Sequence, residues 1–142
     1  MTGSADGLPE ARPAVDWDGL RQRAVEVAQL AYAPYSRFPV GAAGLSDRGA
    51  VVVGCNVENA SYGLTLCAEC GLVSALAAAG GGRLVAVAVR RADGSPVMPC
   101  GRCRQLLWEH GGPDCLLDAS GTVQPLSAVL PDAFDPTHLD PR

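Results

Sequence analysis

The sequence contains no lysine, and all eleven of its basic residues are arginine. Fifteen acidic residues outweigh them, so the 142-residue chain carries a formal net charge of −4. Duplex nucleic acid and anionic membranes are bound largely through excess positive charge, so this composition argues against either as a partner. The exclusive use of arginine, together with abundant alanine and glycine, suggests a GC-rich genome and hence a bacterial source.

Long apolar runs are also missing. No stretch approaches the ~20 residues that a membrane-spanning helix requires, and residues 1–15 lack the apolar core of a signal peptide. We therefore expect a cytoplasmic protein with a disordered leader over residues 1–15 and a flexible tail over residues 136–142. In a reducing compartment six cysteines are not expected to form a disulfide framework, so their spacing indicates metal or catalytic chemistry.

A single domain is expected over residues 16–135, because the chain has about the length of one domain and shows no internal repeat. Periodicity and turn residues predict five short strands interleaved with helices. The resulting order is typical of an α/β protein, a three-layer α/β/α sandwich with a five-stranded mixed sheet. The expected helices cover residues 17–32, 67–79, 101–110 and 127–130, and the expected strands cover residues 38–45, 51–57, 84–89, 115–117 and 122–125.

Three cysteines fall at the expected starts of two helices: Cys67 at one, and Cys100 and Cys103 at the other. A Cys-x-x-Cys pair brings two thiolates close enough to bind one tetrahedral Zn²⁺, and a helix N-terminus lowers thiolate pKa values. Three cysteine ligands leave a fourth position for water, which is typical of a catalytic zinc. Glu69 follows Cys67 by two residues, a spacing that can place its carboxylate beside such a water for proton transfer.

A zinc ligand, one residue, Glu, and then Pro-Cys-x-x-Cys is the pattern of zinc-dependent base deaminases. Here it is Cys67-Ala68-Glu69 followed by Pro99-Cys100-Gly101-Arg102-Cys103. The chain resembles the small, homotetrameric, three-cysteine cytidine deaminases over roughly residues 17–134. Besides the zinc motif, the resemblance rests on the segments 31–36, 38–43, 54–63, 99–105 and 130–134.

This resemblance implies hydrolytic deamination of cytidine and 2′-deoxycytidine to the corresponding uridines and ammonia, a step of pyrimidine salvage. It also implies a cytidine deaminase-like fold, a homotetramer with active sites shared between subunits, and no nucleic-acid or membrane partner. One Zn²⁺ per subunit would be held by Cys67, Cys100 and Cys103, with Glu69 as the catalytic proton carrier. The implied substrate contacts are Phe38 on the pyrimidine, Asn56 and Glu58 at the ribose hydroxyls, and Ala60, Tyr62 and Phe134 approaching from neighbouring subunits.

One position departs from the family. Cys70 stands where these enzymes usually have an arginine, which donates hydrogen bonds to the ligand sulfurs and offsets the charge of three thiolates. We expect Arg102, between the last two ligands, to supply this charge, with Arg104 as the alternative.

The cysteines alone also allow a different class of protein. Cys67-x-x-Cys70 with Cys100-x-x-Cys103 is the signature of a closed four-cysteine structural zinc site, as in a zinc-stabilised binding module. Among related enzymes, blasticidin-S deaminase shares the zinc motifs, whereas the run 56–61 favours a free nucleoside as the substrate. An alternative interpretation of the aromatic residues Phe38, Phe134 and Tyr62 is that they simply pack within the protein.

Overall fold

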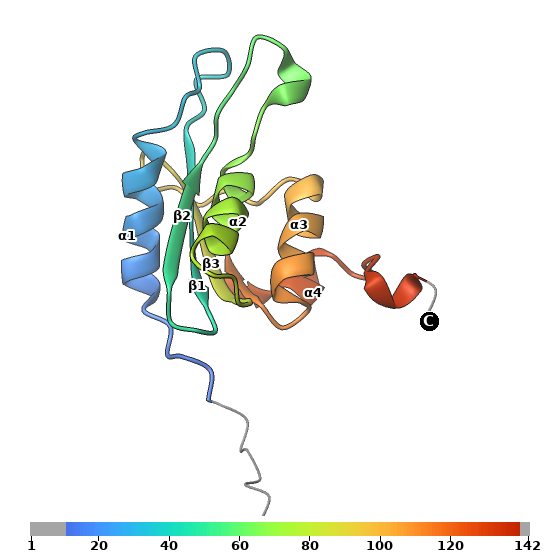
Figure 1. Cartoon of the computed structure of the whole chain (residues 1–142). Helices are drawn as coiled ribbons and strands as arrows, with labels where there is room; N and C mark the ends of the chain where they lie inside the picture. The colour runs from blue at the N-terminus through green and yellow to red at the C-terminus, as the bar shows by residue number, and fades with distance from the viewer. Residues whose placement is uncertain (1–10, 140–142) are drawn as a thin grey trace, which may run out of the picture.

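The computed structural model describes residues 11–139, and the outer parts of the expected leader and tail lie outside these residues. None of the helices among the described residues is long and apolar enough to cross a membrane. Figure 1 shows the elements in chain order. They are α1 (Trp17–Ala28), β1 (Val40–Ser46), β2 (Val51–Cys55), η1 (Tyr62–Leu64), α2 (Ala68–Ala78), β3 (Leu84–Arg91), α3 (Gly101–Gly111), β4 (Leu116–Asp118), β5 (Val123–Pro125), α4 (Leu126–Val129) and η2 (Pro136–His138).

The strands form one sheet in the order β2-β1-β3-β4-β5. Only the β3–β4 pair is parallel; the other pairs are antiparallel. Helix α1 covers one face of the sheet, while α2 and α3 pack side by side on the other (Figure 1). The three-layer sandwich with a five-stranded mixed sheet is therefore confirmed.

Each face of the sheet has its own apolar core. The larger core lies beneath α2 and α3 and includes the fully buried Leu72, Leu107 and Leu117. The smaller core lies beneath α1, where Ala24 packs with other alanines from the neighbouring strands. Small side chains on both surfaces allow the helix to approach the sheet closely.

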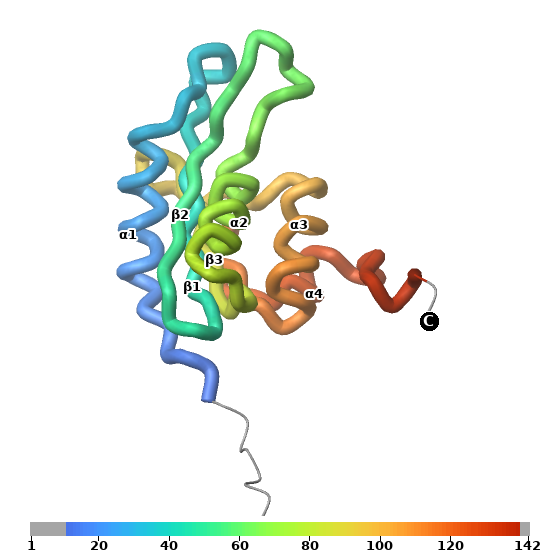
Figure 2. The backbone as a smooth tube through the Cα atoms, in the orientation of Figure 1, coloured from blue at the N-terminus to red at the C-terminus, as the bar shows by residue number. Residues whose placement is uncertain are grey.

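The first helix ends four residues earlier than the sequence predicts, at Ala28 instead of Tyr32. Tyr32 makes backbone hydrogen bonds outside the helix instead. Its N–H donates to the carbonyl of Asn56, and its own carbonyl accepts from Glu58 N–H. The segments 29–39 and 56–66 consequently run side by side at one end of the molecule (Figure 2). Helices α2 and α3 both begin at this same end.

Helix α2 lies unusually close to β2 because a glycine faces it. A Cβ atom at Gly54 would lie 2.3 Å from both the carbonyl oxygen of Ala68 and the backbone nitrogen of Leu72. Real Cβ contacts are essentially never shorter than 3.0 Å, so only glycine permits this approach. Gly54 thereby sets the height of the first turn of α2 above the sheet.

A buried ion cluster joins the sheet to α1. Arg90 Nη2 lies 2.8 Å from Asp118 Oδ1, and Arg90 Nη1 also donates to the Asp118 carbonyl at 2.8 Å. Arg21 Nε of α1 donates to Asp118 Oδ2 at 2.6 Å. Burial opposes ionisation of Asp118, but the hydrogen bonds from Arg90 and Arg21 outweigh it and lower the pKa of this carboxyl.

Candidate metal centre and active site

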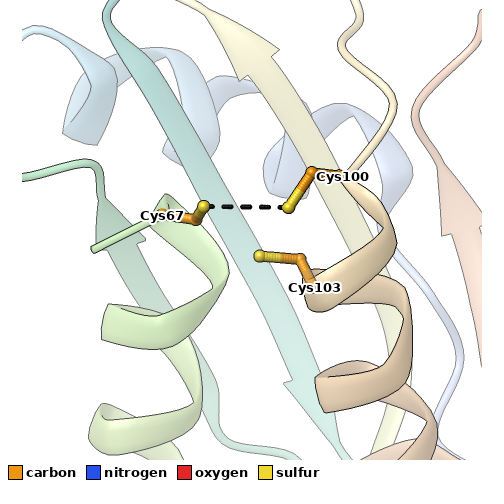
Figure 3. A group of neighbouring side chains, drawn as sticks. All are labelled: Cys67, Cys100 and Cys103. Carbon is orange, nitrogen blue, oxygen red and sulfur yellow. Dashed lines mark hydrogen bonds between the residues drawn. The ribbon is translucent and has the colours of Figure 1, made fainter. Parts of the chain in front are cut away.

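Three cysteine side chains converge where α2 and α3 begin. Cys67 is the N-cap of α2, Cys100 is the N-cap of α3, and Cys103 lies in the first turn of α3. Their Sγ atoms all lie within 4.8 Å of one another, and the Cys67 and Cys100 Sγ atoms are 3.9 Å apart (Figure 3). Zinc–thiolate bonds of about 2.3 Å in a tetrahedron place sulfurs about 3.8 Å apart. The cysteine cluster therefore fits a zinc ion, as the sequence predicts.

The start of α3 also supplies hydrogen bonds to the sulfur of Cys100. Burial opposes ionisation of the Cys100 thiol, but donors that include the backbone N–H groups of Cys103 and Arg102 lower its pKa overall. Burial raises the pKa of Cys67 and of Cys103, and the nearby carboxylate of Glu69 raises the latter further. Such thiols need a cation to stay ionised together, and a bound metal ion provides one.

Glu69 lies in the first turn of α2 and is only 3% exposed. Burial is the main cause that raises the pKa of its carboxyl, while a hydrogen bond with the side chain of Cys103 opposes the shift. A carboxyl group held next to a reacting atom can act as a general acid or base. The structure thus places a buried carboxyl group beside the sulfurs of Cys67 and Cys103.

Cys67, Cys100 and Glu69 line a cavity of about 250 Å³, and the buried Cys103 completes the group of three sulfurs beside it. Its walls are mostly apolar with a few polar groups, which is typical of small-molecule sites. Thr65, Val97 and Met98 contribute to it although no sequence motif marks them. The lining residues are Phe38, Val40, Asn56, Thr65, Cys67, Ala68, Glu69, Val97, Met98, Pro99 and Cys100.

Arg102 reaches the sulfur atoms and Arg104 does not. Arg102 Nη2 lies 3.9 Å from Cys67 Sγ and 3.6 Å from Cys70 Sγ, and it donates to the Thr65 carbonyl at 3.2 Å. Arg104 instead donates to backbone carbonyls at 2.9 and 3.1 Å. Among the described residues, Cys70 is not part of the group of three Sγ atoms. The geometry therefore matches an open three-cysteine site rather than a closed four-cysteine one.

Asn56 lines the cavity and also holds the backbone next to it. Its Oδ1 accepts from Val40 N–H at 2.8 Å, and its Nδ2 donates to the Phe38 carbonyl at 2.9 Å. One amide hydrogen of Asn56 and one lone pair of its oxygen remain for a ligand.

Glu58 lies in the adjoining cavity of about 310 Å³, which shares Thr65 with the first. Its carboxylate accepts from the backbone N–H groups of Tyr35 and Ser36 and from the Ser36 hydroxyl. The Ser36 hydroxyl is the main cause that lowers the pKa of Glu58. Glu58 is therefore held ionised at the edge of the cysteine cavity.

The resemblance assigns Ala60, Tyr62 and Phe134 to the active sites of neighbouring subunits, and all three are exposed in this chain. Ala60 and Tyr62 lie on the 56–66 segment, where the Tyr62 ring packs edge-on against Tyr35 at 5.9 Å. Phe134 lies on the C-terminal segment that extends from the body of the domain (Figure 1) and stacks on His138 at 5.4 Å. The structure does not bring these residues to the cysteines of their own chain in the cavity described above.

Known proteins share this fold and these motifs. Residues 17–117 match the family model described as the cytidine and deoxycytidylate deaminase zinc-binding region. The cytidine deaminase of Mycobacterium tuberculosis (strain H37Rv) is 60% identical over 122 residues, which cover 86% of this chain and 92% of that protein. The cytidine deaminase of Halalkalibacterium halodurans is 42% identical over 125 residues, covering 84% and 95%.

Solved structures agree with the sequence matches. The crystal structure of cytidine deaminase from M. tuberculosis has a TM-score of 0.84 at 59% identity and covers 86% of this chain and 99% of that chain. That from M. leprae has a TM-score of 0.82 at 55% identity, covering 84% and 100%. The resemblance based on the sequence motifs is confirmed. The chain belongs to the zinc-binding family of cytidine and deoxycytidylate deaminases.

Proposed function

We propose that this protein is a cytidine deaminase that hydrolyses cytidine and 2′-deoxycytidine to the corresponding uridines and ammonia, within pyrimidine salvage. The observation that carries the proposal is a group of three cysteine sulfurs beside one small cavity that Cys67, Cys100 and the buried Glu69 line. The Asn56–Glu58 segment at its edge favours a free nucleoside over a nucleic-acid strand, and the acidic net charge agrees with that choice.

Cys67, Cys100 and Cys103 would hold one Zn²⁺ per subunit, because three thiolates at this spacing match its ligand preference. When bound, the ion activates water as a nucleophile and stabilises developing negative charge. Arg102 offsets part of the charge of the thiolates from α3, taking the role of the arginine that Cys70 replaces in α2.

Glu69 carries the protons of the reaction. Its carboxylate accepts a proton from the attacking water and passes it to N3 of the cytosine ring. After the oxygen has bonded to C4, Glu69 accepts the remaining proton of that hydroxyl group and delivers it to the amino nitrogen. The bond from C4 to this nitrogen then breaks, so that ammonia leaves and the C4 carbonyl of the uridine forms. Its buried position beside the sulfurs keeps the Glu69 carboxyl within reach of the reacting atoms for both transfers.

Phe38 packs on the pyrimidine ring, since its side chain lines the cavity beside the cysteines. Asn56 binds the ribose through the donor and acceptor that its backbone contacts leave free. The ionised Glu58, in the adjoining cavity, accepts a hydrogen bond from a ribose hydroxyl.

A homotetramer with shared active sites completes the proposal. Large apolar side chains are exposed on the 56–66 segment and on the C-terminal segment, including Tyr62, Leu64, Leu66 and Phe134. Such surfaces suit contacts between subunits, through which Ala60, Tyr62 and Phe134 reach the cavity of another copy. A cytoplasmic location is part of the same proposal, because free thiols like the six found here persist in reducing compartments.

The test of catalysis is the ultraviolet change on mixing zinc-loaded protein with cytidine. The proposed Glu69→Gln variant keeps its zinc and loses at least about 100-fold in kcat, the lower range for losing a general acid–base. Glu109→Gln, an exposed glutamate on α3, serves as the matched control and keeps full turnover. Failure of the zinc-loaded parent protein to convert either nucleoside would overturn the function, and substantial turnover by Glu69→Gln would overturn the role of Glu69.

The test of assembly is sedimentation at the concentration used for kinetics. We expect a particle of about four times the 14.6 kDa chain mass. Phe134→Ala should lower kcat/KM although this residue is remote from the cysteines of its own chain. A fully active monomer would contradict the proposal that active sites are shared between subunits. It would leave the proposed reaction unaffected.

A further inference from the structure

A cation lies over the aromatic side chain that lines the cysteine cavity. The Cζ atom of Arg91 is 4.3 Å from the centroid of the Phe38 ring. This distance is well within the range of about 6 Å over which a guanidinium is attracted to a ring face. Arg91 is at the end of β3 and is not among the residues that line the cavity. Its effect on the cavity therefore passes through Phe38.

The pairing of β1 with β3 fixes where Arg91 stands. Arg91 is the register partner of Val40, which follows Phe38 by two residues and itself lines the cavity. A tight turn closes immediately after it, with Arg91 N–H donating to the Ser95 carbonyl at 2.8 Å and Gly94 N–H donating to the Arg91 carbonyl at 3.0 Å. The backbone of Arg91 is therefore held by hydrogen bonds on both sides, in the strand pairing and in the turn.

The Phe38 ring is one of few favourable partners of this guanidinium among the described residues. Arg91 Nε is buried and makes no hydrogen bond within the described part of the chain. The one ion pair of Arg91 found there, with Asp93, is at the outer limit of 4.0 Å. Because its charge is only weakly compensated by hydrogen bonds or carboxylates, the contact with the ring accounts for its position.

The backbone of Phe38 is already held on both sides. Its N–H donates to Ser36 Oγ at 3.0 Å, and its carbonyl accepts from Asn56 Nδ2 at 2.9 Å. The ring itself is 40% exposed and belongs to neither apolar core. With the backbone fixed, the rotation of the ring is the remaining freedom, and Arg91 is positioned to remove it.

We propose that Arg91 is a positioning residue for substrate binding: it holds the Phe38 ring in the orientation on which the pyrimidine packs. This inference rests on the proposed function, since it assigns a purpose to the ring of Phe38 in that reaction. Arg91 does not touch the substrate. Its contribution is to reduce the ordering that the ring must undergo when the base arrives, which favours binding of nucleoside and of product alike.

Steady-state kinetics with cytidine and equilibrium binding of uridine test this role. Arg91→Met keeps the length of the side chain but removes its charge; we expect KM and the uridine dissociation constant to rise about threefold to tenfold, the range for a partly exposed cation–π contact. The turnover number kcat should change much less, because binding of ground state and transition state are affected equally. Arg91→Lys keeps a positive charge, so its KM and uridine dissociation constant should rise less. Arg23 is an exposed arginine on α1, and Arg23→Met should have the same KM and uridine affinity as the parent.

A double-mutant cycle with Phe38→Leu separates positioning from general damage. If Arg91 acts through the ring, Arg91→Met has no further effect on uridine binding once Phe38 is leucine. An equal loss in both backgrounds, or no loss in the parent background, would overturn the inference. If the parent protein deaminates cytidine and Arg91→Met has the same KM and uridine affinity, only this inference is refuted. If the parent protein shows no turnover, the proposed function is refuted.

A spectroscopic readout tests the contact without any need for turnover. The chain has only two phenylalanines, so labelling with 4-fluorophenylalanine gives two fluorine resonances, which Phe134→Leu assigns. Arg91→Met should move the Phe38 resonance and leave that of Phe134 in place, and uridine should shift the Phe38 resonance in the parent. A Phe38 resonance unchanged by Arg91→Met would refute the contact itself.

Discussion

Replacing Gly54 by alanine tests whether the sheet controls the geometry of the metal centre. The new Cβ would lie 2.3 Å from backbone atoms of Ala68 and Leu72, and 2.7 Å from the carbonyl carbon of Gly71. Ordinary contacts begin at 3.4 Å, so α2 must move away from β2 by roughly 1 Å. Cys67 caps that end of the helix and must move with it.

The energetic effect follows from which atoms collide. Overpacking a core costs about 1–3 kcal/mol when side chains can adjust. Here the colliding atoms belong to helical backbone, so we expect the upper end, about 3 kcal/mol. For a domain of this size that corresponds to a loss of about 10 °C in Tm. A displaced Cys67 should also weaken zinc binding, because the cysteine sulfurs would leave their tetrahedral spacing.

Two assays follow the change: thermal unfolding, recorded with and without a chelator, and competition for zinc against a chromophoric chelator. Gly63→Ala is the control, since a Cβ there meets nothing within 4 Å. Gly71→Ala is a graded case, because its Cβ would lie 3.3 Å from the Gly54 Cα. If Gly54→Ala melts and binds zinc as the Gly63→Ala control does, the close packing of α2 on β2 does not set the metal geometry.

Two further features yield predictions of their own. Asp118→Ala should cost about 3–5 kcal/mol in chemical unfolding, because it leaves the buried charge of Arg90 without its carboxylate partner; a loss below about 1 kcal/mol would contradict this. Since folding lowers the pKa of Asp118, its stabilising contribution is present above about pH 4 and lost below it, so the Tm gap between the parent and Asp118→Asn should shrink on acidification. Arg102→Gln should lower both zinc affinity and turnover, whereas Cys70→Ser should keep its zinc; unchanged zinc affinity in Arg102→Gln would show that the thiolate charge is offset elsewhere.

The element order and the sheet could be predicted from the sequence because apolar runs and turn residues alternate clearly. Boundaries were less predictable where long-range contacts decide them. The helical pattern continues to Tyr32, but backbone hydrogen bonds with the 56–58 segment end the helix at Ala28. Strand β3 runs two residues past its apolar run, to Arg91, because Asp118 partners the buried Arg90.

The site was predictable to the extent that chemistry is encoded in short spacings. Cys67, Cys100, Cys103 and Glu69 follow from two motifs. The structure groups the three sulfurs beside a cavity that Cys67, Cys100 and Glu69 line. The choice between Arg102 and Arg104 needed side-chain geometry, since both lie close to the ligands in sequence. The Arg91–Phe38 contact depends on strand register and has no local signal.

Cys67 and Cys100 occupy the N-cap positions of α2 and α3, where serine or aspartate would ordinarily accept a hydrogen bond from the first turn. In the described structure the Cys67 side chain makes no such capping bond, and Cys100 offers the first turn of α3 only a sulfur acceptor. We therefore expect metal binding to stabilise both helix starts, as in other proteins whose folding is coupled to metal binding. On chelation, amide hydrogen exchange should accelerate first in the opening turns of these two helices, while the sheet remains protected.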